Sequence, residues 1–142
     1  MPAGEDGLLV LIRGSGLVVE AVRGDVPGPS VDAAWRAMAG FGVEPAAVFP
    51  LGADRAGVHG LWLEHARQAG VVDDEGFLVT AVVTGSSEVG WVRVRLGGSA
   101  DVARLVDGQG RIEFIARSRD GHRICGITAE EYEHWGVGLE LP

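Results

Sequence analysis

Three residues of one predicted helix, His59, Glu64 and His65, could in principle coordinate a zinc ion. Zinc-binding helices place two histidines four residues apart, so that both side chains reach one ion from the same face. Here the histidines are six residues apart, which is about 600° of helical rotation and places them roughly 120° from a shared face. His65 lies at the edge of the apolar face and His59 near the first turn, so we expect structural roles and no bound metal.

Cys125 and His122 are the next pair that could do chemistry, as a thiolate and its base. Residues three apart on a strand point to opposite faces, so these two side chains should point away from each other. Cys125 shares its face with Ile127, which favours a buried structural cysteine.

Serine and glycine patterns complete the search for a catalytic or cofactor motif. Ser15, Ser86 and Ser87 lack the Gly-x-Ser-x-Gly spacing of a nucleophile elbow, and the Gly52–Gly57 stretch lacks the Lys-Ser/Thr of a phosphate-binding loop. We therefore expect no cofactor, and the balance is against an enzyme.

Acidic and aromatic side chains remain as candidates, and their chemistry is recognition of another protein. Exposed aromatic residues are common anchors of interfaces, and carboxylates attract basic partners. Trp91 has a second interpretation, in which it packs under a helix while the arginines of its strand extend to solvent. The predicted partner-contacting residues are Asp73, Asp74, Trp91, Glu130, Glu131, Tyr132, Glu133 and Trp135.

Charge and composition limit the classes of function. The chain has 142 residues, 46% of them hydrophobic, and its net charge is −8. All 12 basic residues are arginine, and no run of them forms the basic patch that nucleic acid or an anionic membrane requires. The single cysteine cannot form an internal disulfide. Residues 1–7 carry no positive charge and no apolar run approaches ~20 residues, so we expect a cytoplasmic, non-membrane protein.

Hydrophobic periodicity predicts one α+β domain over residues 1–142, with an antiparallel sheet built from three hairpins and about four short helices in the order ββα-α-ββα-ββα. The helix after Ser30 has a clear apolar stripe at Val31, Ala34, Trp35 and Met38. The predicted hairpin strands are 8–12 with 17–22, 77–84 with 89–96, and 111–119 with 122–127. The other predicted helices cover 57–69, 100–106 and 128–135, and short strands are predicted at 46–49 and 137–141.

The stretch from Arg111 to Trp135 carries the clearest local signals. Asp120-Gly121 between two β-rich runs predicts a two-residue type I′ turn. Thr128 followed by Glu131 is a capping box, which predicts that a helix follows the hairpin directly.

These features lead to one expected function and two alternatives. We expect a non-enzymatic protein-binding or inhibitory module, in one version an immunity- or antitoxin-type protein whose acidic face covers the basic active site of a toxin enzyme. The first alternative is a small-molecule-binding domain or small enzyme in which Arg93, Arg95 or Arg117 holds an anionic ligand. The second is a homodimer that pairs through a sheet edge.

Overall fold

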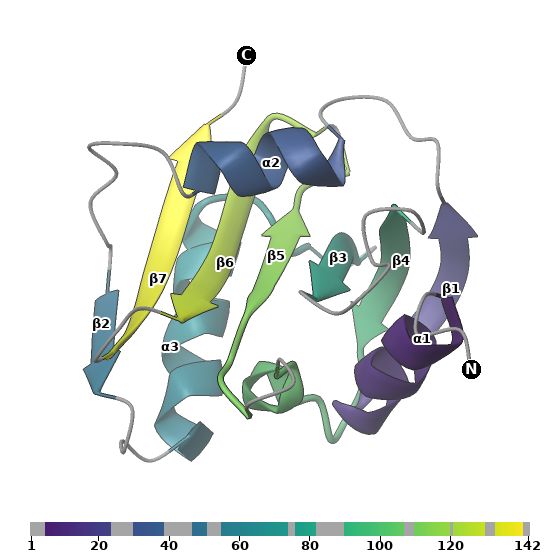
Figure 1. Cartoon of the computed structure of the whole chain (residues 1–142), viewed down its shortest axis with the longest axis horizontal. Helices are drawn as coiled ribbons and strands as arrows, with labels where there is room; N and C mark the ends of the chain where they lie inside the picture. Colours follow the sequence, from purple (N-terminus) through teal and green to yellow (C-terminus); the bar gives the residue numbers. More distant parts are fainter. Residues whose placement is uncertain are drawn as a thin grey trace.

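A seven-stranded antiparallel sheet organises the protein, in the strand order β1-β4-β3-β5-β6-β7-β2 (Figure 1). The computed structural model describes residues 5–23, 30–38, 47–50, 55–73, 76–81, 90–106, 110–119, 121–129 and 133–140. The strands are β1 (Leu17–Arg23), β2 (Ala47–Pro50), β3 (Phe77–Ala81), β4 (Trp91–Leu96), β5 (Phe114–Arg117), β6 (Arg123–Ala129) and β7 (Glu133–Glu140). The helices are α1 (Glu5–Gly14), α2 (Val31–Met38), α3 (Arg55–Gln68) and the 3-10 turn η1 (Val102–Arg104).

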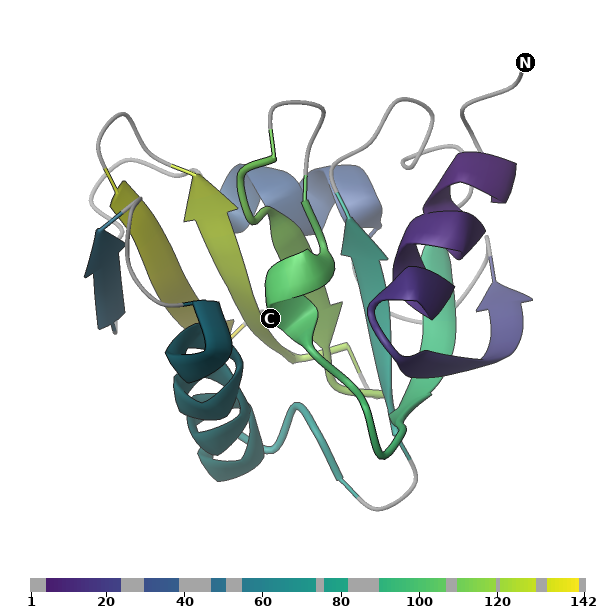
Figure 2. The same cartoon turned by 90° about the horizontal axis from the view of Figure 1, so that it is seen from below.

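Helices cover both faces of the sheet. Helix α2 lies in front of β5 and β6 in Figure 1, while α3 lies behind β6 and β7. Figure 2 shows α1, η1 and α3 together on the side of the sheet opposite α2. The larger core lies on the α1/α3 side and includes Leu8, Ile12, Trp62, Phe77 and Phe114, each at most 2% exposed. The smaller core lies under α2.

Strand β4 shows how alternation divides its side chains between the two cores. Val92 and Val94 belong to the core on the α1/α3 side, whereas Trp91 belongs to the core under α2. This alternation agrees with the sequence pattern, since successive strand residues point to opposite faces. Both faces of the sheet centre are buried, because all residues of β3 and β5 are buried.

The α+β class and the antiparallel sheet are confirmed, and so are two of the three predicted hairpins. Strand β3 pairs with β4, and β5 pairs with β6. The β5–β6 connection is longer than the predicted two-residue turn. The hydrogen bond that closes it runs from the Ser118 amide to the Arg123 carbonyl at 2.9 Å, so the turn lies between these two residues. Gly121 has a φ of 84°, which favours glycine; Asp120 lies outside the described residues. The predicted short strand at 46–49 corresponds to β2.

The first predicted hairpin is wrong, because the run Leu8–Ile12 belongs to α1. A short continuous apolar run fits a buried strand and a buried helix equally well. In the helix, Leu8 and Ile12 are one turn apart and both are 0% exposed, while Val10 on the opposite face is 71% exposed. Strand β1 consequently pairs with β4 instead of with this segment.

The predicted helix at 128–135 is also wrong, since β6 runs to Ala129 and β7 begins at Glu133. Thr128 pairs with Trp135 across the two strands. The capping-box pattern is a local preference, and packing of Trp135 and Val137 against the core under α2 overrides it. The predicted strand at 137–141 forms part of β7. The predicted helix at 100–106 is reduced to η1, whose N-cap is Asp101.

Candidate functional site

The predicted partner-contacting residues divide into several groups in the structure. Four of them, Asp74, Glu130, Glu131 and Tyr132, lie outside the described residues, and Glu133 begins β7. Asp73 is exposed and forms an ion pair with Arg119, with 3.8 Å between Oδ2 and Nη2. This ion pair places Asp73 next to the connection between β5 and β6, in which Arg119 lies.

Trp91 is buried at 1% exposure, as in the interpretation that placed it under a helix. Its ring lies 5.3 Å from the guanidinium carbon of Arg117, which is itself 0% exposed. A guanidinium over an indole is a favourable cation–π arrangement, more so away from water. Trp91 thus anchors a buried arginine and is not available to a partner in this conformation.

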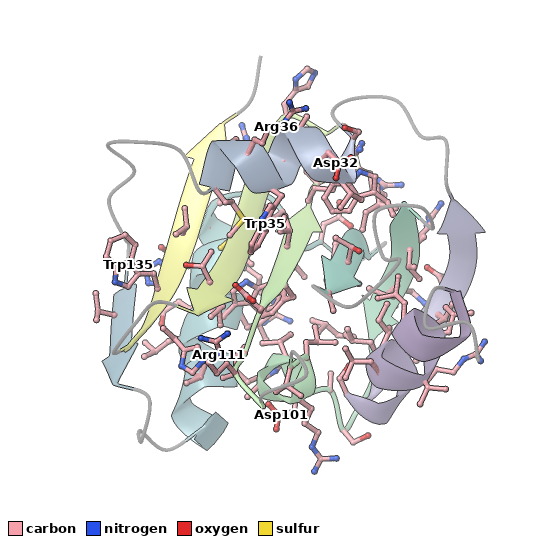
Figure 3. All side chains as sticks on the ribbon, in the orientation of Figure 1. Asp32, Trp35, Arg36, Asp101, Arg111 and Trp135 are labelled. Atoms are coloured by element: carbon pink, nitrogen blue, oxygen red, sulfur yellow. The ribbon has the colours of Figure 1, made fainter. Side chains whose placement is uncertain are left out.

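Trp135 lies on β7, directly opposite Val48 of the edge strand β2. Val48 is 48% exposed, and Trp135 is half-buried against the core under α2. Trp35 of α2 is half-buried against the same core (Figure 3). We call Val48, Trp135 and Trp35 the α2-side apolar surface. Two half-buried indoles and an exposed valine on one side of the sheet are suitable anchors for a protein partner.

The arginines of the sheet do not converge on a common ligand position. Arg93 and Arg95 both pair with Glu20, at Nε–O distances of 3.7 and 3.2 Å. Arg117 lies in the interior and donates its Nε–H to the Ser118 carbonyl at 3.2 Å. The arrangement gives no support to the alternative in which Arg93, Arg95 or Arg117 holds an anionic ligand.

Arg123 fulfils a different structural role at the end of α3. It donates from Nη1 to the Ala69 carbonyl at 3.0 Å, next to Gly70, whose φ is 77°. A cation at this position satisfies a terminal carbonyl and interacts favourably with the helix dipole.

Charge is unevenly distributed along the sequence, which has 20 acidic residues and 12 arginines. Six of the carboxylates lie in two short runs without an arginine, Asp73-Asp74-Glu75 and Glu130-Glu131-Tyr132-Glu133. We call these two runs the acidic segments.

Both edge strands of the described sheet carry features that oppose pairing with another strand. β2 has four residues and contains Pro50, which has no N–H to donate. In β1 the register shifts between Val19 and Ala21, and Glu20 at this bulge is paired with two arginines. Bulges, prolines and charges are the usual means by which proteins block edge pairing. Dimerisation through a sheet edge is therefore not part of our proposal.

Two histidines hold backbone amides near η1, a role that sequence reasoning missed. His59 Nδ1 accepts the Val102 amide at 3.0 Å, and His134 Nε2 accepts the Ile112 amide at 2.9 Å. His59 therefore has a structural partner, as expected, and His134 is 2% exposed. No sequence signal links His134 to Ile112, because the contact depends on how β7 lies beside the chain before β5. Among the described residues, no three His, Cys, Asp or Glu side chains are placed to hold a metal ion.

Cys125 is 4% exposed in the larger core, with Ile127. Burial raises the pKa of its thiol from 9.0 to about 12, because desolvation disfavours the thiolate. At pH 8 its thiolate fraction should fall by about three orders of magnitude relative to a free cysteine. We expect iodoacetamide to leave the folded protein unlabelled at pH 8 over hours and to label it fully in urea, as measured by mass spectrometry. Native labelling at the denatured rate would contradict this burial.

The same shift predicts how this thiol contributes to stability at alkaline pH. Because the folded pKa is above the unfolded value, the protonated thiol favours the folded state. This contribution is complete below pH 9, and it is lost as the pH rises through the interval from 9.0 to about 12. Urea unfolding at a series of pH values, compared with a Cys125→Ala variant, would isolate it.

Comparison with known proteins assigns no family to this arrangement. The chain matches no family model, no curated protein and no solved structure. The fold therefore defines the class on its own, an α+β protein with one antiparallel sheet between helices. No helix within the described ranges is long and apolar enough to cross a membrane.

Proposed function

We propose that this chain is a non-enzymatic protein-binding module that recognises a basic partner. The carrying observation is the acidic balance of the chain, with 20 acidic residues against 12 arginines and six carboxylates gathered in the two acidic segments. Such segments attract a cationic surface and accelerate its association. The sheet and its helices contribute the scaffold and its apolar contacts.

The α2-side apolar surface supports the location of the contact. Trp135 lies on β7, and the segment just before β7 contains Glu130, Glu131 and Tyr132. A half-buried indole next to carboxylates in sequence combines a hydrophobic anchor with charge attraction, the usual composition of a strong interface. We place the contact there in preference to Asp73, since Arg119 already pairs with that carboxylate.

A more specific version is an immunity- or antitoxin-type protein. In it, the acidic segments would cover a basic active-site cleft of a toxin enzyme, such as a nuclease, and the indoles would be buried on binding. Substrates of nucleases are polyanions, so their clefts are cationic and complementary to this chain. This version adds the requirement that binding inhibits the partner.

The proposal predicts that a triple change, Glu130→Gln, Glu131→Gln and Trp135→Ala, abolishes capture of a basic protein from a lysate of the source organism. Loss of an interface tryptophan alone should weaken binding by about 30-fold. The captured protein is identified by mass spectrometry, purified, and titrated by calorimetry at two salt concentrations. Binding should weaken with salt, since it depends on exposed charges.

Glu64→Gln is the control, because this carboxylate is exposed on α3, on the other side of the sheet from the proposed surface. This variant should retain the partner. Equal affinity of the triple variant and the wild type would refute the proposed surface, and an acidic partner would refute the electrostatic basis. The immunity version fails separately if an equimolar amount of the chain leaves the purified partner's enzymatic activity unchanged.

A further inference from the structure

Two histidines from distant parts of the chain hold the two arms of one small hairpin. The first arm is Val102–Val106, which includes η1, and the second is Gly110–Glu113. A β-bridge between Val106 and Ile112 joins them, and the Glu113 amide donates to the Leu105 carbonyl at 3.0 Å. We call these described residues the η1 hairpin.

Each arm is attached to a different element by one imidazole. His59 of α3 accepts the first amide of the first arm, from Val102, and His134 of β7 accepts the amide of Ile112 in the second arm. Figure 3 labels the preceding residues, Asp101 and Arg111, at the lower part of the molecule.

These hydrogen bonds fix the protonation state of both rings. An imidazole nitrogen that accepts an N–H carries no proton of its own, so His59 bears its proton on Nε2 and His134 on Nδ1. Adding a second proton to either ring occupies the accepting nitrogen. The imidazolium and the backbone amide then present two donors to each other, and the hydrogen bond is lost.

Loss of these bonds would expose apolar surface, since the η1 hairpin covers part of the larger core. Val102, Leu105 and Ile112 are each 0% exposed within that core. His134 is buried, so its imidazolium would also lack hydration. His59 is half-buried against Trp62, with ring centroids 6.5 Å apart, and is the ring more accessible to solvent protons.

Charged groups on the elements packed against the two rings are of both signs. Next to η1, Asp101 accepts the Ala103 amide at 3.0 Å and lies 3.8 Å from Arg104. The remaining charged or titratable residues of the adjoining elements are Arg111 and Glu113 beside Ile112, Glu133 and Glu140 on β7, and Arg55, Glu64, His65 and Arg67 on α3.

We propose that His59 and His134 form a pH-sensitive latch, which keeps the η1 hairpin docked while both imidazoles are neutral and releases it when they are protonated. The consequence is an acid-induced local opening beside α3, with the sheet intact. This device is independent of the partner surface on the α2 side.

The test measures amide hydrogen exchange by NMR at pH 7.5 and pH 5.0, corrected for the intrinsic pH dependence of exchange. In the wild type, protection of the Val102 and Ile112 amides should fall by about tenfold or more at pH 5.0. Protection of Val92 in the sheet should not change. Equal protection of Val102 and Ile112 at both pH values would overturn the proposal, as would an equal loss at Val92, which would indicate global unfolding.

His59→Asn and His134→Gln separate the latch from a general acid effect. Each amide oxygen lies near the position of the accepting ring nitrogen and does not titrate in this range. The double variant should keep its protection at pH 5.0, whereas His65→Asn, a third histidine outside the latch, should behave as the wild type. Each single variant should remove the pH dependence of its own amide alone. Nitrogen chemical shifts of the wild-type rings give a readout independent of the variants, and rings that stay neutral at pH 5.0 would also overturn the proposal.

Discussion

Replacing Gly126 by alanine is expected to lower the free energy of unfolding by about 3 kcal/mol, because no space exists for a methyl group there. A Cβ at this position would meet the Phe114 carbonyl oxygen on the adjacent strand, and would lie 2.9 Å from Met38 Cε and 3.1 Å from Ile115 Cα. Two of these three atoms belong to backbone. Met38 is 3% exposed, so its terminal methyl group would have to shift within the core.

Chemical denaturation followed by circular dichroism measures this effect, and Gly138→Ala is the control. Gly138 lies on the neighbouring strand β7, and the nearest atom to its added Cβ is the Ile124 carbonyl oxygen at 4.0 Å. It should change stability by no more than about 0.5 kcal/mol. If both variants lose the same stability, the cost arises from the strand backbone and not from the contact with α2.

This contact also links the fold to the proposed surface. Gly126 allows α2 to approach the sheet closely through Met38, and α2 carries Trp35 of the α2-side apolar surface. Displacement of α2 by the alanine methyl group should therefore weaken partner binding as well as stability.

Much of the fold could be predicted from the sequence where local and tertiary preferences agree. The alternation of β4 and the stripe of α2 each place apolar residues on the side where the structure buries them. Leu8–Ile12 could not be assigned in this way, because a run that is apolar at every position has no periodicity to distinguish a helix from a strand. The prediction at 128–135 failed since a capping box competed with strand pairing that depends on distant residues.

The candidate site was less predictable than the fold. Trp91 and Trp135 both alternate with other side chains on strands, and only the position of α2 decides that one is buried and the other half-exposed. The interaction of His134 with Ile112 joins residues 22 positions apart, one on β7 and one in the segment before β5, and the first part of β7 was predicted as a helix. By contrast, the two acidic segments can be read directly from the sequence.

Trp62 connects α3 to the sheet, and its loss should cost a large part of the stability of the fold. It is 2% exposed and packs edge-on against Phe114, with the ring centroids 5.2 Å apart. The centroid of the Phe77 ring lies 5.8 Å from that of Trp62. Its indole N–H donates to the Cys125 carbonyl at 3.0 Å, which ties α3 to the centre of β6. Trp62→Ala should lower the free energy of unfolding by about 4 kcal/mol through the cavity and the lost hydrogen bond.

Trp62→Phe keeps the prediction testable if the alanine variant does not fold. Phenylalanine retains much of the aromatic packing but leaves the Cys125 carbonyl without the indole donor, so we expect a loss of about 2 kcal/mol. The control is Trp35→Phe, because Trp35 is half-buried on α2 and should lose less than about 1 kcal/mol. Equal losses in the two phenylalanine variants, measured by urea unfolding, would show that the hydrogen bond from α3 to β6 adds nothing beyond burial of the ring.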